Sequence, residues 1–185
     1  SASQSPFTAM SQCGSNACAR DRLFSAAINL FYRNGIRAVS VDAIAAEDGT
    51  TKVTFYRVFE SKDDLIVQVL QEQSKRFWEW WDAIVAQYPG QPRMQIEQLI
   101  ERSKDDIIGD EACRGCAVAN AAVEIVDEEH PARAVIKKHK LEIAQRLRDL
   151  CREMGARQPE ALGDALSLLY SGAFSARLSY DGREQ

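Results

Sequence analysis

Apolar side chains recur at intervals of three and four residues along most of this chain, which is the spacing of one face of an α-helix. The first such segment, residues 19–34, is followed by Gly35, and a glycine commonly ends a helix. A longer segment follows at 62–86, and in the last third of the chain Pro131 and Pro159 each open another helix. No segment alternates between apolar and polar residues as a strand does, so the pattern predicts an all-α fold.

Two short helices are predicted between the first two of these segments. Ser40 and Thr51 can cap them, because a hydroxyl side chain accepts a hydrogen bond from the first free N–H groups of a helix. The second short helix runs from Thr51 to Phe59 and follows a tight turn at Asp48-Gly49. Two short helices joined by a glycine-containing turn form a helix-turn-helix unit.

The same pattern divides the chain into three parts. Residues 1–18 carry no charge and are expected to be a disordered leader, residues 19–62 form the helix-turn-helix domain, and residues 63–185 form a larger helical body. Within the body, a helix at 92–108 precedes the nearly all-apolar segment 116–126, which is expected to be a buried helix.

Composition places the chain among ordinary soluble globular proteins, with 45% hydrophobic and 27% charged residues in a length of 185. No apolar run approaches the ~20 residues that a membrane-spanning helix needs. The five cysteines are an odd number without the spacing of a disulfide framework. Free thiols are typical of a reducing compartment, so a cytoplasmic protein is expected.

The net charge of -4 disfavours a nucleic-acid partner at first sight, but the charge is unevenly distributed. Residues 19–62 contain seven basic and five acidic residues, which leaves 16 basic and 22 acidic residues elsewhere. A mildly basic head on an acidic body suits a protein that binds DNA with one end only.

A specific set of residues is spread over the first three predicted helices and the turns between them: Ala26, Ala27, Leu30, Phe31, Gly35, Ser40, Val41, Ile44, Ala45, Gly49, Lys52, Thr54, Tyr56, Arg57, Phe59, Ser61 and Lys62. With this pattern, residues 22–65 resemble the DNA-binding domain of the TetR family of repressors. The body, with Arg114-Gly115-Cys116 and the opening of the last helix at Pro159, also looks like the family's C-terminal domain. The sequence departs from the family's usual residues at Asp48, Thr50, Val53 and Glu60.

The resemblance implies a transcriptional regulator that binds a specific DNA sequence. The N-terminal end of a recognition helix meets base edges in the major groove, and here it carries Thr51, Lys52, Val53 and Thr54. Tyr56, Arg57 and Lys62 are expected to contact phosphates. In isolation, Lys52 and Arg57 would be interpreted as surface charges and Tyr56 as a half-buried core residue.

One small head makes few contacts with DNA, so a homodimer on a near-palindromic operator is expected, with half-sites about 34 Å apart or a multiple of that distance. The last two helices carry apolar stripes that predict an intersubunit four-helix bundle. One stripe is Ile136, His139, Ile143, Leu147, Leu150 and Met154; the other is Leu162, Leu166, Leu169, Ala173 and Ala176. The alternative is that the stripes complete the core of a single subunit.

The family resemblance also implies release from the operator by a small-molecule effector bound in the body. The residues expected to line its pocket are Phe77, Trp78, Trp81, Ile100, Asn120 and Phe174. Aromatic residues at helical spacing are equally typical of plain core, because apolar pockets and apolar cores look alike in sequence.

Cys113 and Cys116 form a vicinal pair that a redox or metal sensor would use. An inert, packed thiol is the simpler interpretation, because His130 and His139 fit no spacing of a metal site. His130 is expected instead to cap the helix that Pro131 opens. The sequence predicts neither a metal nor a cofactor.

An enzyme and a helical interaction module are the rival classes of function. The chain contains no nucleophile elbow, phosphate loop or metal motif, so the sequence predicts that it is not an enzyme. An interaction module whose head no longer binds DNA would show no salt-dependent binding to DNA.

Overall fold

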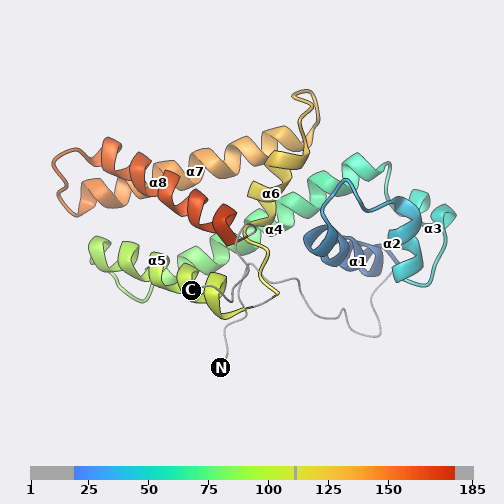
Figure 1. Cartoon of the computed structure of the whole chain (residues 1–185), viewed down its shortest axis with the longest axis horizontal. Coiled ribbons are helices and arrows are strands. Elements are labelled where there is room, and N and C mark those ends of the chain that lie inside the picture. Colours follow the sequence, from blue (N-terminus) through green and yellow to red (C-terminus); the bar gives the residue numbers. More distant parts are fainter. Residues whose placement is uncertain (1–18, 111, 178–185) are drawn as a thin grey trace.

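The computed structural model describes residues 19–110 and 112–177 of the 185-residue chain, and every regular element in these ranges is a helix (Figure 1). The predicted all-α fold class is confirmed. The elements are α1 (Ala19–Asn34), α2 (Val41–Glu47), α3 (Lys52–Val58), α4 (Lys62–Val85), α5 (Pro92–Gly109), α6 (Ala117–Glu124), α7 (Ala132–Glu153) and α8 (Pro159–Arg177). The leader predicted at 1–18 and residues 178–185 of the predicted body lie outside the described residues.

Side-chain caps set the starts of three helices. Ser40 Oγ accepts the N–H of Ala43 at 3.1 Å before α2, and Thr51 Oγ1 accepts the N–H of Thr54 at 3.4 Å before α3. Ser61 Oγ does the same at the start of α4, with a donor–acceptor distance of 3.0 Å. Each cap satisfies an N–H group that has no partner inside its helix and stabilises the helix by about 1 kcal/mol.

Helices α1, α2 and α3 gather at one end of the molecule, which we call the head (Figure 1). Gly49 has a φ of +67° in the turn between α2 and α3, a conformation that a residue with a Cβ rarely adopts. Thr50 donates its backbone N–H to the carbonyl of Ala45 at 2.9 Å and so closes this turn. The helix-turn-helix expected from the sequence is present, and α3 runs from Lys52 to Val58 with Thr51 and Phe59 as its caps.

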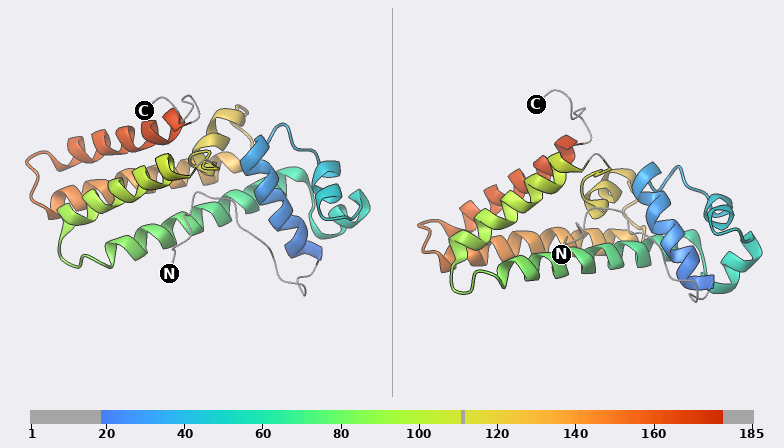
Figure 2. Two further views of the ribbon diagram at one scale, coloured as in Figure 1. Left: turned by 60° about the horizontal axis from the view of Figure 1, so that its bottom comes forward. Right: turned by 90° about the horizontal axis from the view of Figure 1, so that it is seen from below.

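Helix α4 is shared by two hydrophobic cores. Its first half packs with α1 to α3, with α6 and with the start of α7, and its second half packs with α5, α7 and α8. The buried residues of α4 in the first core are Leu65, Ile66, Val69 and Leu70; those in the second are Phe77, Trp81 and Ile84. Figure 2 shows α4 running from the head along the whole length of the remaining helices.

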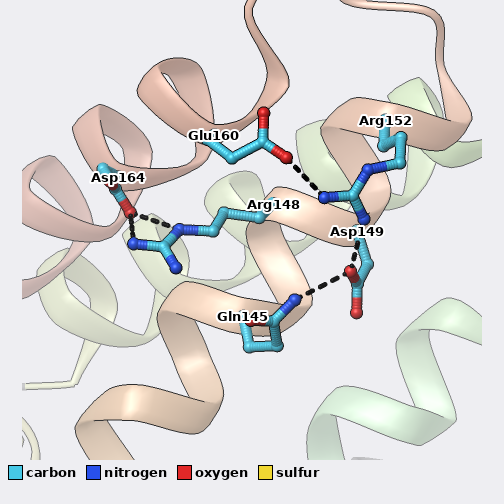
Figure 3. Close-up of polar contacts among 6 residues, drawn as sticks. All are labelled: Gln145, Arg148, Asp149, Arg152, Glu160 and Asp164. Atoms are coloured by element: carbon cyan, nitrogen blue, oxygen red, sulfur yellow. Dashed lines mark hydrogen bonds and ion pairs between the residues drawn. The ribbon is translucent and has the colours of Figure 1, made fainter.

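The antiparallel helices α7 and α8 lie close together at Gly163. A Cβ placed on Gly163 would lie 2.6 Å from the Cα of Arg148, so no larger residue fits there without moving α8. Ion pairs flank this crossing: Arg148 bonds Asp164 at 2.6 Å, and Arg152 bonds Glu160 at 2.5 Å (Figure 3). Glycine thus provides the close approach, while the charged groups remain at the surface.

Two expectations about the body are wrong. The apolar segment 116–126 is not a fully buried helix, because α6 ends at Glu124 and leaves Val123 and Val126 80% and 76% exposed. Only one face of so short a helix meets the core, so an apolar sequence did not imply burial on all sides.

The apolar stripe of α7 does not point towards a second subunit. Its residues Ile136, His139, Ile143, Leu147 and Leu150 are buried within the subunit against α4, α5 and α8. The alternative that this stripe completes the subunit's own core is therefore correct for α7.

No helix in the described part of the chain is both long and apolar enough to span a membrane.

Candidate nucleic-acid interface

Two buried phenylalanines fix α3 to the head. Phe55 and Phe59 are 0% and 2% exposed, and their ring centroids lie 5.4 Å apart. The guanidinium of Arg20 covers the ring of Phe59, 5.2 Å from its centroid. With one side held in this way, the opposite side of α3 faces solvent in a defined orientation.

The solvent side of α3 carries the residues expected to contact DNA. Thr51, Lys52 and Arg57 are exposed, and Thr54 is half-buried because it packs beside its capping partner. Val53 and Tyr56 are 68% and 51% exposed. The structure therefore brings all of these side chains to one short helix at the outer end of the head (Figure 1).

Lys52 takes part in one contact within the head. Its Nζ lies 3.4 Å from Asp42 Oδ2, and both side chains are more than half exposed. An ion pair between exposed groups contributes little to stability, typically less than about 1 kcal/mol. The ammonium can therefore exchange this partner for a base edge or a phosphate at small cost.

Lys62 differs from the other expected contacts because it is half-buried. Its Nζ donates to the carbonyl of Ile36 at 2.9 Å, and this burial lowers the pKa of the ammonium, while neighbouring carboxylates raise it. Lysine has three N–H donors, so two of them are left for another acceptor. Lys62 also begins α4, where the first N–H groups form an anion-binding end.

An ion pair that sequence reasoning missed connects α1 to the turn of the helix-turn-helix. Arg22 Nε donates to Asp48 Oδ1 at 3.1 Å, and the Asp48 side chain is only 7% exposed. Its second oxygen, Oδ2, is buried and has no hydrogen-bond partner among the described residues. The only hint in the sequence was that Asp48 departs from the family's usual residue, because nothing local links two positions 26 residues apart.

The aromatic residues expected to line an effector pocket lie in the second core. Phe77, Trp81 and Phe174 are buried there, and Trp78 lies beside them under the guanidinium of Arg146, which is 4.0 Å from the ring centroid. Tyr170 joins the cluster with its ring 4.9 Å from that of Phe174, and sequence reasoning did not select it.

The other two expected pocket residues do not belong to this cluster. Ile100 is 46% exposed on α5. Asn120 lies on α6, where it donates to the carbonyl of Arg114 at 2.7 Å and faces a cavity of about 20 Å³ between α1, α4 and α6. Such a volume holds about one water molecule, so the head and body are closely packed here.

His139 is the polar group at the centre of the aromatic cluster. Its ring lies 4.8 Å from that of Phe77, and its Nδ1 is 2.8 Å from the hydroxyl of Ser74. Burial lowers the pKa of His139 to about 4, against a smaller opposite effect of Glu142, so the ring is neutral at pH 7. Its Nε2 is buried without a hydrogen-bond partner among the described residues.

Cys113 and Cys116 are free thiols in the loop before α6. Burial raises the pKa of Cys116, which disfavours the thiolate needed for oxidation or metal binding. Cys113 is buried beside Tyr32, whose hydroxyl lies 3.9 Å from the sulfur and accepts the N–H of Arg114 at 2.8 Å. The burial of both sulfur environments favours packed thiols. In the described ranges no group of three or more His, Cys, Asp or Glu residues could hold a metal ion.

His130 is placed as expected of a capping residue. The backbone N–H of Ala132 donates to its Nδ1 at 3.0 Å, at the start of α7. Its other nitrogen, Nε2, faces Asp63 Oδ1 at 3.0 Å and thereby connects the loop before α7 to the first turn of α4.

Residues 23–69 match the family model described as "Bacterial regulatory proteins, tetR family". No curated protein is similar enough in sequence to count as a match.

Solved structures match over nearly the whole chain. A TetR-family transcriptional regulator from Streptomyces coelicolor is 30% identical, with a TM-score of 0.80, over 89% of this chain and 86% of the other. A TetR-type transcriptional regulator from Streptomyces avermitilis is 30% identical, with a TM-score of 0.77, over 90% of each chain. The reduced form of NemR from Escherichia coli shares the fold at 16% identity, with a TM-score of 0.75 over 89% of each chain.

Because His139 is buried, we expect the folded protein to be less stable in mild acid. Because its pKa is about 4 in the folded protein and 6.5 in the unfolded chain, the unfolded chain binds more protons between these values. The free energy of unfolding should therefore fall as the pH drops from 6.5 to 4, by up to about 3 kcal/mol from this group.

Urea unfolding at several pH values measures this effect. His139→Gln should reduce the fall between pH 6.5 and 4, whereas His130→Gln, a change to the only other histidine, should keep it. A fall of equal size in wild type and His139→Gln would show that other groups cause the acid sensitivity.

Proposed function

Since this chain belongs to the TetR family and is therefore a DNA-binding transcriptional regulator, we propose that it is a repressor that a small-molecule effector releases from its operator. The solved relatives are transcriptional regulators, which favours this function over the enzyme and the interaction module left open by the sequence. We further propose a DNA-binding domain at 19–62, a regulatory and dimerisation domain at 63–185, and a cytoplasmic location where DNA is accessible.

The exposed side of α3 is the observation that supports DNA binding best. Val53 and Tyr56 expose apolar surface next to the cations Lys52 and Arg57, on a helix whose other side is anchored in the core. A methyl-bearing side chain such as Val53 fits the methyl group of thymine, while Lys52 fits guanine acceptors. We propose that Thr51 to Thr54 contact bases.

The phosphate contacts are proposed for three residues with hydroxyl or cationic groups. Tyr56 and Arg57 follow the base-contacting turn on α3, and Lys62 begins the next helix. Such contacts fix the orientation of a recognition helix and make binding depend on salt.

Selection of duplexes from a random DNA library tests the DNA-binding function, and a near-palindromic sequence is the expected product. Tyr56→Phe combined with Arg57→Ala should weaken binding to that duplex about tenfold or more, since neither side chain can then bond a phosphate. The slope of log affinity against log salt concentration should become shallower, by about 0.9 for each phosphate that the protein no longer neutralises.

Arg157→Ala is the matched control, because it removes an exposed guanidinium from the loop between α7 and α8, far from the head. It should leave both affinity and salt slope unchanged. If no palindromic sequence is enriched with the folded wild-type protein, the central proposal fails.

We propose that the dimer forms through the outer face of α8. This face is exposed and uncharged over about three turns. Its residues lie three or four positions from one another along one side of the helix: Leu162, Ala165, Leu168, Leu169, Gly172 and Ala173. Leu168 and Leu169 are each 72% exposed. An isologous pairing of two such faces would bury these leucines and place the two heads at a symmetric spacing.

Leu168→Glu combined with Leu169→Glu should convert the dimer to a monomer, because two carboxylates per subunit would have to be buried in the interface. Sedimentation velocity measures the change. Ile108→Glu, on α5 and 64% exposed, is the control and should remain dimeric. A wild type that is monomeric at high concentration contradicts the proposal.

We propose that the effector binds among the aromatic side chains of the second core. His139 supports this placement, because its buried Nε2 offers one hydrogen-bonding position inside an otherwise apolar cluster. A small aromatic or aliphatic compound with a single polar group would satisfy this nitrogen and bury its apolar part against Phe77 and Trp78.

The three tryptophans of the chain, Trp78, Trp80 and Trp81, all lie on α4 beside this cluster, so intrinsic fluorescence reports on it. A compound that releases the selected duplex should also change this fluorescence, with the same midpoint concentration. His139→Phe should weaken the compound about tenfold, whereas a compound that acts equally on wild type and variant binds elsewhere.

A further inference from the structure

One peptide group in the loop between α1 and α2 forms hydrogen bonds through both its carbonyl and its N–H group. The carbonyl of Ile36 accepts a hydrogen bond from Lys62 Nζ at 2.9 Å. The N–H of Arg37, which belongs to the same peptide group, donates to Glu124 Oε2 at 3.0 Å. Lys62 begins α4 directly after the head, whereas Glu124 ends α6 in the body. This planar peptide group therefore connects Lys62, a proposed phosphate contact, to Glu124 of the body.

Gly35 leaves room for the carboxylate of Glu124 beside Arg37. A Cβ on that glycine would lie 2.9 Å from Glu124 Oε2, so a larger residue at position 35 would push this flexible side chain aside. The end of α6 is also fixed to α7, because Arg133 Nη1 donates to the carbonyls of Ala122 and Ile125 at 3.3 and 3.1 Å.

The charges in this region favour the same arrangement. The side chain of Lys62 is half-buried, and the negative charge of Glu124 is one of two that favour its protonated form. The body thus supplies both a geometric restraint on the peptide group and a counter-charge for the ammonium. The hydrogen bond from Lys62 to Ile36 is part-buried, whereas the one from Arg37 to Glu124 is exposed.

We propose that Glu124 is a positioning residue for DNA binding, which holds Lys62 through the Ile36–Arg37 peptide group so that its remaining N–H groups meet a phosphate of the operator. This inference rests on the proposed function. Glu124 itself contacts no DNA, and by its negative charge alone it would weaken binding to phosphates. Removal of Glu124 should therefore strengthen DNA binding if only its charge matters, and weaken DNA binding if it positions Lys62.

The experiment measures affinity for the selected duplex over a range of salt concentrations. Glu124→Ala should weaken binding about fivefold, which corresponds to the removal of one hydrogen bond. It should also reduce the salt slope by about 0.9 for each head, as Lys62→Ala does. The double variant should bind no worse than Lys62→Ala, since both changes remove the same phosphate contact.

Two conservative variants separate geometry from charge. Glu124→Gln keeps an oxygen at the same reach and should bind within about twofold of wild type. Glu124→Asp keeps the charge but withdraws it by one methylene, and should also weaken binding about fivefold. It tests the inference as well if the alanine variant does not fold. Glu128→Ala, an exposed acidic residue in the following loop, is the control for charge and should have no effect.

Tighter binding by Glu124→Ala, or effects of Glu124→Ala and Lys62→Ala that multiply in the double variant, would overturn the inference while leaving the DNA-binding function intact. A folded wild type that binds no duplex would instead overturn the proposed function. The two failures are therefore distinguishable.

Discussion

Helix α4 spans 24 residues and contributes to both hydrophobic cores, with Leu65 in the first and Phe77 in the second. Because a continuous helix keeps all its backbone hydrogen bonds only if it stays straight or bends gently, it cannot adjust one half independently of the other. Its first half must satisfy the packing of α1 to α3, and its second half that of α5, α7 and α8. The orientation of the head relative to the body is therefore largely determined by the rotation and direction of this one helix.

The polar contacts between head and body add specificity to that arrangement. Tyr32 on α1 bonds the loop before α6, Glu124 bonds the loop after α1, and His130 faces Asp63 at the start of α4. All three body partners belong to α6 or to the loops on either side of it. A shift of α6 would thus disturb several hydrogen bonds at once, whereas the apolar contacts beneath it tolerate small displacements more easily.

The sequence predicted the elements well because helix ends depend on local chemistry. Ser40, Thr51 and Gly35 act on neighbouring N–H and carbonyl groups, so their roles could be inferred from their positions alone. Contacts between residues far apart had no such local signature, and both the Arg22 pair with Asp48 and the Glu124 bond to Arg37 were missed. The sequence also could not show what covers an apolar stripe. Periodicity indicates that α7 has an apolar face but not which neighbouring helix packs against it.

Gly163 has a consequence beyond the subunit. Its missing side chain lets α8 lie against the backbone of α7, and this contact limits how far α8 can rotate about its own axis. That rotation decides which leucines face outward and which face the core. If a second copy pairs with α8, Gly163 therefore influences the direction of that pairing and the symmetry axis of the dimer, although it contributes no side chain to the interface.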